Sequence, residues 1–369
     1  MRLGMFMMPV HPPARSFTET LGEDEEKALY ADKLGFDELW LGEHFSASSE
    51  PIPSPLMFMA SLVPRTRNLR FGTGVICLPN HDPAIVAAEV AQFDHMSRGR
   101  FMLGIGPGGL LSDFELFDNA DRTLRARKTM EAIATIKRIW SQDPPYDLAG
   151  EFRPVQLKDA VIPSLGIGFM PKPFQKGGPP ITMSVSSRNS PTARVAGEQG
   201  WGILSGNNMP ANAVATHWQS YSKACAAAGR PARGENWRVA RNIMVAEADA
   251  EARDRVFSAQ GSNRYFYTYM REVLSRVGIL SVMKPDPAMP DAAATVEVIT
   301  EACVIYGSPR TMLDKLVAFR DEVGPFGTLL MTGLDWSGVN AAWEQQSMRL
   351  MAEEVMPKFR QHVTARAAE

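Results

Sequence analysis

The chain has 369 residues, a formal net charge of −2 and 45% hydrophobic residues, a composition typical of a globular protein with ample material for a core. Basic and acidic residues are mixed along the chain without a basic stripe, which argues against nucleic acid as a partner. No apolar run approaches the roughly 20 residues that cross a bilayer, and no Cys or His spacing suits a metal. The three scattered cysteines suit reduced thiols, so we expect a cytoplasmic protein without a membrane or metal partner.

Strand and helix signals alternate over the first 140 residues. Short apolar runs predict strands at 3–8, 36–41, 69–78 and 101–105. Segments with helical spacing predict helices at 23–34, 55–63, 83–96 and 124–140. The expected strands are mostly apolar rather than alternating, which is typical of a parallel sheet that is covered on both faces.

The alternation breaks over residues 141–179, which are polar and rich in proline, and then resumes. Further strands are expected at 181–185, 202–204, 237–246 and 327–332. Further helices are expected at 192–198, 211–228, 309–323 and 340–355, with irregular helix over 249–300. Eight strands alternating with helices predict an α/β fold, a single (β/α)8 TIM barrel over residues 1–369, with insertions at about 141–179 and 257–300 at the C-terminal face.

His44 is the first candidate for chemistry, because active sites of such barrels lie at the carboxyl ends of the strands. The second expected strand ends in Leu41-Gly42-Glu43-His44, so His44 can face the barrel mouth. A neutral imidazole can act as a general acid or base near neutral pH. The alternative is a structural histidine bonded to a neighbouring loop.

Glycines mark the ends of the next two strands. Gly72 and Gly74 in the third strand allow a flat ring, or equally another backbone, to approach closely. The fourth strand ends in Gly104-Ile105-Gly106-Pro107-Gly108-Gly109, a poor match to the dinucleotide-binding fingerprint. We interpret that segment as a flexible loop at the barrel mouth.

An anion site is expected where the fifth strand runs into a helix. Hydroxyls, an arginine and the free N–H groups of a helix N-terminus converge there, and a simple N-cap by Ser190 is the alternative. An N-cap needs one such residue, whereas this run offers several, so we favour a phosphate site formed by Ser186, Ser187, Arg188, Asn189, Ser190 and Thr192.

Two further features are less specific. The segment 257–300 is expected to cover the site, since long insertions at barrel mouths commonly serve as lids. Its aromatic residues either line a hydrophobic pocket or form a packed helix: Tyr265, Phe266, Tyr267 and Tyr269. His81 lies at a strand-to-helix turn and is a candidate for the mouth, whereas His95 lies on a helix and is expected to be structural.

Taken in order, these segments resemble the bacterial luciferase-like flavin-dependent monooxygenase family. Leu41–His44 is similar to the family's strand-two Glu-His, and Gly72–Val75 with the His81-Asp82-Pro83 turn is similar to its strand three. The most specific part is 93–101, which resembles the family signature D-x-(M/L)-S-x-G-R. The sequence from 336 onward resembles the terpene and ketone monooxygenases of the family.

The resemblance implies a cofactor, partners and roles for residues. The cofactor would be reduced FMN supplied by a separate flavin reductase, and O2 would provide one oxygen atom for a small hydrophobic ketone, aldehyde or terpene. His44 would handle a proton beside the flavin, with Glu43 orienting His44 or a neighbouring loop. Flavin contacts would fall near Gly74 and Val75, where the family often has a non-prolyl cis peptide, and at Gly106; phosphate contacts would fall on Ser187–Ser190. A homodimer or related heterodimer through the early helices is also implied.

Departures from the family and rival functions define the remaining expectations. Luciferases proper carry a reactive cysteine and an arginine after strand four, where this chain reads Ile105-Gly106-Pro107-Gly108, so light emission is not expected and Arg188 is expected to supply the cation. One rival is a hydride-transfer oxidoreductase of the same fold that uses a deazaflavin. The other is a non-enzymatic flavin-binding protein, against which the retained His44 argues.

Overall fold

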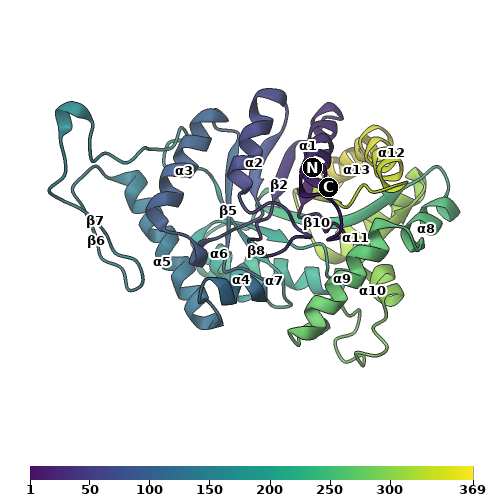
Figure 1. Ribbon diagram of the computed structural model, residues 1–369. Coiled ribbons are helices and arrows are strands. Elements are labelled where there is room, and N and C mark those ends of the chain that lie inside the picture. Colours follow the sequence, from purple (N-terminus) through teal and green to yellow (C-terminus); the bar gives the residue numbers. More distant parts are fainter. Residues whose placement is uncertain (369) are drawn as a thin grey trace.

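Eight parallel strands close into a barrel in the computed structural model, which describes residues 1–368 (Figure 1). In order around the barrel these are β1 (Arg2–Met7), β2 (Glu38–Leu41), β3 (Arg70–Thr73), β5 (Phe101–Gly106), β8 (Ile181–Val185), β9 (Gly202–Ser205), β10 (Trp237–Val245) and β12 (Thr328–Gly333). The ring closes because β12 pairs with both β10 and β1. The expected (β/α)8 barrel is therefore confirmed.

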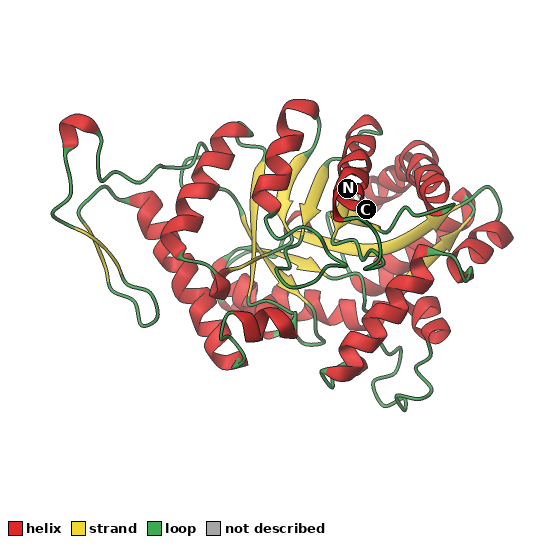
Figure 2. Ribbon diagram, viewed as in Figure 1, coloured by secondary structure: helices red, strands yellow, loops and turns green. Residues whose placement is uncertain are grey.

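Helices surround the strands on the outside of the barrel (Figure 2). They are α1 (Phe17–Lys33), α2 (Pro55–Leu62), α3 (Pro83–Met96), α5 (Arg122–Ser141), α6 (Pro191–Gln199), α7 (Ala211–Ala227), α11 (Pro309–Val323), α12 (Asn340–Leu350) and α13 (Met356–Ala368). The short helix α4 (Leu111–Leu116) lies instead in the segment after β5, where its Asp113 reaches His44. Several start at a local signal in which a capping side chain precedes a proline. Ser54, Asp82 and Ser308 each accept a hydrogen bond from a first-turn N–H, and the proline that follows occupies a position where no donor is needed.

The barrel interior is filled by side chains from successive strands. Its apolar layer is made of Phe6, Trp40, Met102, Leu204, Ala240 and Leu330. Beneath it the buried Glu38 carboxylate accepts hydrogen bonds from Arg238 Nε at 2.9 Å and from Trp40 Nε1 at 2.8 Å. Gly104 is required for closure, since a Cβ there would lie 1.7 Å from the Thr73 carbonyl oxygen.

Two segments leave the regular alternation. After α5 the chain forms a projecting arm that carries the antiparallel pair β6 (Tyr146–Leu148) and β7 (Val155–Leu157) (Figure 1). After β10 it forms α8 (Asp249–Phe257), α9 (Ser262–Arg276) and α10 (Val296–Cys303), and then β11 (Val304–Gly307). β11 was not expected. It pairs with the second half of β10, and it follows α10 directly, so no turn residue separates its short apolar run from the helix.

Two other boundaries differ from expectation. The predicted strand 69–78 is interrupted: β3 ends at Thr73, β4 (Ile76–Cys77) pairs only with β5, and the Gly74–Val75 peptide bond between them is cis, as the family resemblance implied. The last helix does not end at Val355. A π-helical turn, Met351–Val355, leads into α13. Pro357 is tolerated there because the regular α-helical hydrogen bonds are already interrupted by this turn.

The two ends of the described chain lie close together, as Figure 1 shows, and Arg360 Nε donates to the Met1 carbonyl oxygen at 3.0 Å. Among the described residues, no helix combines the length and the apolar character needed to cross a membrane.

Candidate active site

A cavity of about 240 Å³ opens at the carboxyl ends of the barrel strands. Its wall includes His44 and Glu50 from the segment after β2, Gly74 and Val75 from the break between β3 and β4, and Ser184–Ser186 from the end of β8. Side chains of α9 cover the opposite side. The cavity is thus assembled from loops that are distant in sequence, in the place where barrel enzymes carry their chemistry.

The imidazole of His44 is held between two carboxylates. Its Nδ1 lies 3.2 Å from Asp113 Oδ2, and its Nε2 lies 3.4 Å from Glu50 Oε2. Burial alone would lower the pKa of His44, but the charges of Glu50 and Asp113 and the hydrogen bond to Asp113 outweigh it and raise the pKa above the usual histidine value. His44 can therefore hold a proton at the cavity wall near neutral pH.

Asp113, on α4, is the ionised partner of this pair. It also accepts hydrogen bonds from the Phe45 N–H at 3.2 Å and the Ser46 N–H at 3.0 Å. Burial would raise the pKa of Asp113, yet the hydrogen bonds from His44, Ser46 and Phe45 lower it below the ordinary value. Since an ionised carboxylate only accepts, Nδ1 of His44 donates to Asp113 and Nε2 is directed to Glu50 and the cavity.

Glu50 is buried and asymmetrically bonded. Its Oε1 accepts a hydrogen bond from the hydroxyl of Tyr269 at 3.0 Å, whereas its Oε2 has no hydrogen-bond partner among the described residues. Burial raises the pKa of Glu50 above its ordinary value, although His44 and the Tyr269 hydroxyl act in the opposite direction.

Glu43 contacts the neighbouring loop rather than His44. Its Oε1 accepts the Cys77 N–H at 2.6 Å and lies 3.0 Å from His81 Nε2. We expected Glu43 to orient either His44 or a neighbouring loop, and this geometry supports the second role. Burial, reinforced by the Glu43 charge, raises the pKa of the Cys77 thiol, so this cysteine at the cavity wall is neutral.

Gly74 and Val75 lie at the cavity wall, but Gly106 lies behind it. A Cβ on Gly74 would meet Phe6 Cε2 at 3.0 Å, and Phe6 also lines the cavity. A Cβ on Gly106 would lie 2.8 Å from both Ser184 Oγ and Val75 Cγ2. Gly106 therefore lets two lining residues approach β5, and it does not face the cavity itself.

The expected anion site forms the turn from β8 into α6. Ser186 lines the cavity, and Ser190 precedes α6 but makes no side-chain cap, because its hydroxyl bonds Thr192 Oγ1 at 2.6 Å. Asn189 has a φ of 49°, and its N–H donates to Thr216 Oγ1 at 2.9 Å. The guanidinium of Arg188 donates to Asn212 and to the Lys284 carbonyl, while its buried Nε has no partner within residues 1–368.

The aromatic residues of α9 divide between the pocket and the protein core. Phe266 and Tyr269 line the cavity, together with Met270, Val273 and Leu274. Tyr267 is fully buried in a core cluster instead, and the Tyr265 hydroxyl donates to the His11 carbonyl oxygen at 3.3 Å. Both of the open alternatives for this segment are thus realised, on different faces of one helix.

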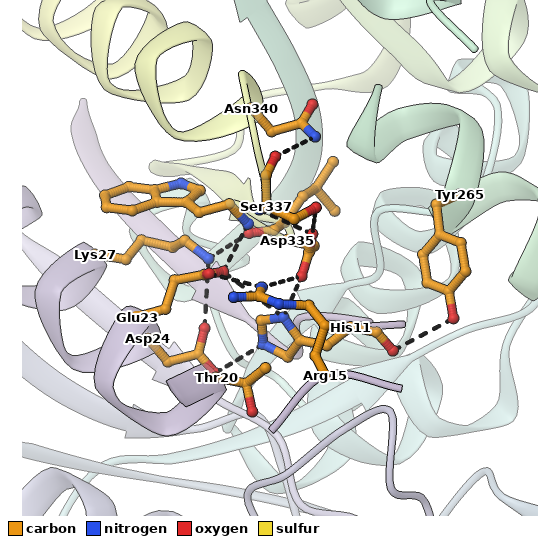
Figure 3. A network of polar contacts seen from close by, with 12 residues as sticks. His11, Arg15, Thr20, Glu23, Asp24, Lys27, Tyr265, Asp335, Ser337 and Asn340 are labelled. Atoms are coloured by element: carbon orange, nitrogen blue, oxygen red, sulfur yellow. Dashed lines mark hydrogen bonds and ion pairs between the residues drawn. The ribbon is translucent and has the colours of Figure 1, made fainter. Parts of the chain in front are cut away.

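A second polar cluster lies beside the barrel mouth, between the loop after β1, helix α1 and the loop after β12 (Figure 3). His11 Nδ1 lies 2.7 Å from Asp335 Oδ1, and Nε2 lies 3.2 Å from Asp24 Oδ2. His11, Glu23 and Asp24 lie close enough together for a metal site, but Arg15 and Lys27 already pair with these carboxylates. The cluster is charge-compensated and ties the loop after β1 to the loop after β12.

Sequence reasoning missed Asp113 and Glu50. The available signal was weak: Asp113 follows the glycine-rich loop at 104–109, and Glu50 precedes Pro51 in a segment without periodicity. An acidic residue in such a loop is usually solvated, and only the burial of these two side chains distinguishes them.

The chain is similar to known proteins over nearly its whole length. The family model for luciferase-like monooxygenase matches residues 1–324. The 4-hydroxyprotoasukamycin monooxygenase of Streptomyces nodosus subsp. asukaensis is 33% identical, with 96% of this chain and 91% of that protein covered. The limonene 1,2-monooxygenase of Rhodococcus erythropolis is 31% identical, with 96% and 86% covered.

A solved structure agrees with these relatives. The oxygenating constituent of 3,6-diketocamphane monooxygenase from Pseudomonas putida, a type II Baeyer-Villiger monooxygenase in complex with FMN, superposes with a TM-score of 0.87 at 26% identity, covering 97% of this chain and 98% of that one. The resemblance expected from the motifs is confirmed by the family match and by both relatives above 30% identity. The chain belongs to the luciferase-like monooxygenase family.

Proposed function

We propose that this chain is an FMN-dependent monooxygenase that inserts one oxygen atom from O2 into a small hydrophobic ketone, aldehyde or terpene. Membership of the family supports the monooxygenase class, and the FMN complex of the diketocamphane enzyme supports the cofactor. The observation that carries the proposal is the position of His44: an imidazole held on both sides by carboxylates faces a largely apolar cavity at the barrel mouth.

The residues around the cavity suit FMN. Gly74 presents a wall without a side chain, against which a flat ring can lie, with Val75 beside it. Ser186 lines the cavity, and the turn that follows it offers backbone N–H groups at the start of α6 and the Nε of Arg188, which suit a phosphate. When bound, reduced FMN supplies the electrons that activate O2.

The chain's own contribution is to hold a proton and exclude water. His44, fixed by Asp113, holds a proton at Nε2, on the side that faces the cavity. Helix α9 covers the opposite side with apolar side chains, which keeps bulk water away from the reacting atoms. Glu43 keeps the loop after β4 in place through Cys77 and His81.

The lining also supports a substrate class. The face contributed by α9 consists mainly of Phe266, Met270, Val273 and Leu274, which make apolar contacts and offer no charged group. Flexible Met and aromatic side chains adapt to compact apolar molecules. The relatives named for limonene and diketocamphane agree with such a substrate.

Two partners follow from the proposal. The diketocamphane relative is described as an oxygenating constituent, which supports a separate flavin reductase as the source of reduced FMN here. A second copy of the chain would pack on α2 and α3, whose outer surfaces expose Met57, Ile85 and Met96. Sedimentation of Met57→Lys with Ile85→Lys, compared with wild type, would test that pairing.

The decisive experiment supplies reduced FMN directly, in the presence of isotopically labelled O2, to a panel of cyclic ketones, aldehydes and terpenes. We expect mass spectrometry to find a product that has gained one labelled oxygen atom. Substrate reduction without O2, when a reduced deazaflavin replaces FMN, would instead indicate hydride transfer. Tight flavin binding without turnover of any panel member by either cofactor would indicate a flavin-binding protein.

A further inference from the structure

The side chain of Glu50 connects the covering helix α9 to His44. Its Oε1 accepts the Tyr269 hydroxyl at 3.0 Å, and its Oε2 lies 3.4 Å from Nε2 of His44. Ser49, the preceding residue, also donates to the Tyr269 hydroxyl, at 3.5 Å. Tyr269 is thus held by the Ser49–Glu50 segment, and the Glu50 carboxylate that bonds it also reaches the imidazole of His44.

We propose that Glu50 is a positioning residue through which the placement of α9 over the cavity sets the protonation of His44. The inference rests on the proposed function only for its activity measurement. Glu50 is nine-tenths buried. In the part of the chain that the structure describes, its Oε2 lacks a hydrogen-bond partner and has His44 as its one close charged neighbour.

Among the groups around His44 and Glu50, Glu50 is the carboxyl group whose ionisation can change. The charges that act on His44 are those of Glu50, of Asp113 on α4 and, without direct contact, of Glu43 in the segment after β2. Glu50 is faced by His44, Tyr269, Asp113 and the more distant His11. Asp113 is already held ionised by hydrogen bonds from His44, Phe45 and Ser46, whereas burial favours the protonated form of Glu50.

The coupling has a definite sign. A hydrogen bond from the Tyr269 hydroxyl stabilises the carboxylate form of Glu50. A negative Glu50 in turn stabilises the protonated imidazole of His44. When α9 lies over the cavity, His44 is therefore favoured in its proton-bearing form. If α9 moves away, Glu50 loses its donor and takes up a proton more readily, and His44 loses its proton more readily.

The test is a titration of the histidine ring resonances in the full-length chain without flavin, so it needs neither O2 nor substrate. His44→Ala assigns the His44 resonance by its loss. We expect Glu50→Gln to move the His44 midpoint to lower pH by about one unit, because a neighbouring negative charge is removed. Tyr269→Phe should move it in the same direction by a smaller amount.

The matched control is Tyr265→Phe. Tyr265 lies on the same helix and also anchors it, but its hydroxyl donates to the His11 carbonyl and does not contact Glu50. We expect this variant to leave the His44 midpoint unchanged. An unchanged midpoint in Glu50→Gln, or equal shifts in both tyrosine variants, would overturn the proposal. If Glu50→Gln does not fold, the comparison of the two tyrosine variants still decides.

The activity arm separates positioning from a structural role. In the product assay with reduced FMN, we expect the pH profile of kcat in Glu50→Gln to shift in the same direction as the His44 midpoint. If the substitution only displaced α9 from the cavity, KM would rise and the pH profile of kcat would stay unchanged. The ring titration requires no turnover, so it tests the role of Glu50 even if the protein is not a monooxygenase. Failure of the proposed function and failure of this inference can therefore be told apart.

Discussion

Nδ1 of His44 and Oδ2 of Asp113 lie 3.2 Å apart, although 69 residues separate them in the chain. His44 follows β2, whereas Asp113 belongs to α4 after β5. The contact orients the imidazole, because the ring nitrogen that bonds a carboxylate must carry the proton. The other nitrogen is left for Glu50 and the cavity.

Asp113→Asn tests this orientation. The amide keeps the size of the side chain but removes the charge that holds His44 protonated, so we expect product formation to fall at least about tenfold, as part of the acid–base contribution. FMN binding should change little. Asp118→Asn, an exposed neighbour, is the control. Equal turnover in the Asp113 variant and wild type would separate Asp113 from the chemistry.

His44→Ala should bind reduced FMN but lose product formation by about 10²–10⁴-fold, the usual range for a general acid or base. O2 should still be consumed, with release of hydrogen peroxide, because reduced flavin is oxidised by O2 in free solution. The measurement is product formed per O2 consumed, with reduced FMN supplied directly. A wild-type ratio and rate in the variant would remove His44 from the mechanism.

Arg188→Ala combined with Ser190→Ala should weaken FMN more than riboflavin. Each charge-assisted bond to a phosphate contributes about 1.5–3 kcal/mol to binding. Riboflavin has no phosphate, so its binding does not depend on these bonds. Titration of both ligands gives the comparison. Arg194→Ala is the matched control, since Arg194 lies on α6 directly after the same turn but forms an exposed pair with Glu198. Equal losses for both ligands would place the phosphate elsewhere.

Gly74→Val should reduce flavin binding while the barrel remains folded. The added Cβ would lie 3.0 Å from Phe6 Cε2, so Phe6, which lines the cavity, must shift. Overpacking of this kind costs about 1–3 kcal/mol. Binding titrations and thermal unfolding check the two parts, with Gly22→Ala on α1, which has open space around it, as the control. Normal flavin affinity would argue against a ring at this wall.

Asp335→Asn should lower the stability of the folded protein near pH 7 and make that stability less sensitive to a fall in pH. Although burial would raise the pKa of Asp335, hydrogen bonds from His11, Ser337 and Arg15 lower it below the ordinary value. Because the folded pKa lies below the unfolded value, this contribution is present above about pH 4 and is lost as the pH falls through the folded value.

Thermal unfolding at several pH values measures the effect. Breaking a buried pair costs on the order of 3 kcal/mol, so the unfolding temperature should fall by several degrees at pH 7, and the difference from wild type should shrink below about pH 4. The exposed Asp159→Asn provides the control. A difference that stays constant across this range would contradict the assignment.

The sequence by itself determined the order of the eight barrel strands and the helices between them, the closed barrel and the place of His44 after the second strand. Each depends on local information: apolar runs identify the strands, caps and prolines mark the helix starts, and a residue directly after a strand must lie at the barrel mouth. The phosphate site proposed at Ser186–Thr192 was predicted in the same way, because the excess of polar residues over capping needs is visible locally.

Only the tertiary structure decided which side chains meet. Hydrophobic periodicity identifies a buried face but carries no information about its neighbour, so the contacts of His44 with Asp113 and Glu50 could not be predicted. The same limit separated Tyr269, at the cavity, from Tyr267, in the core, two residues along one helix. β11 was missed because its few apolar residues become a strand only when β10 extends far enough to pair with them.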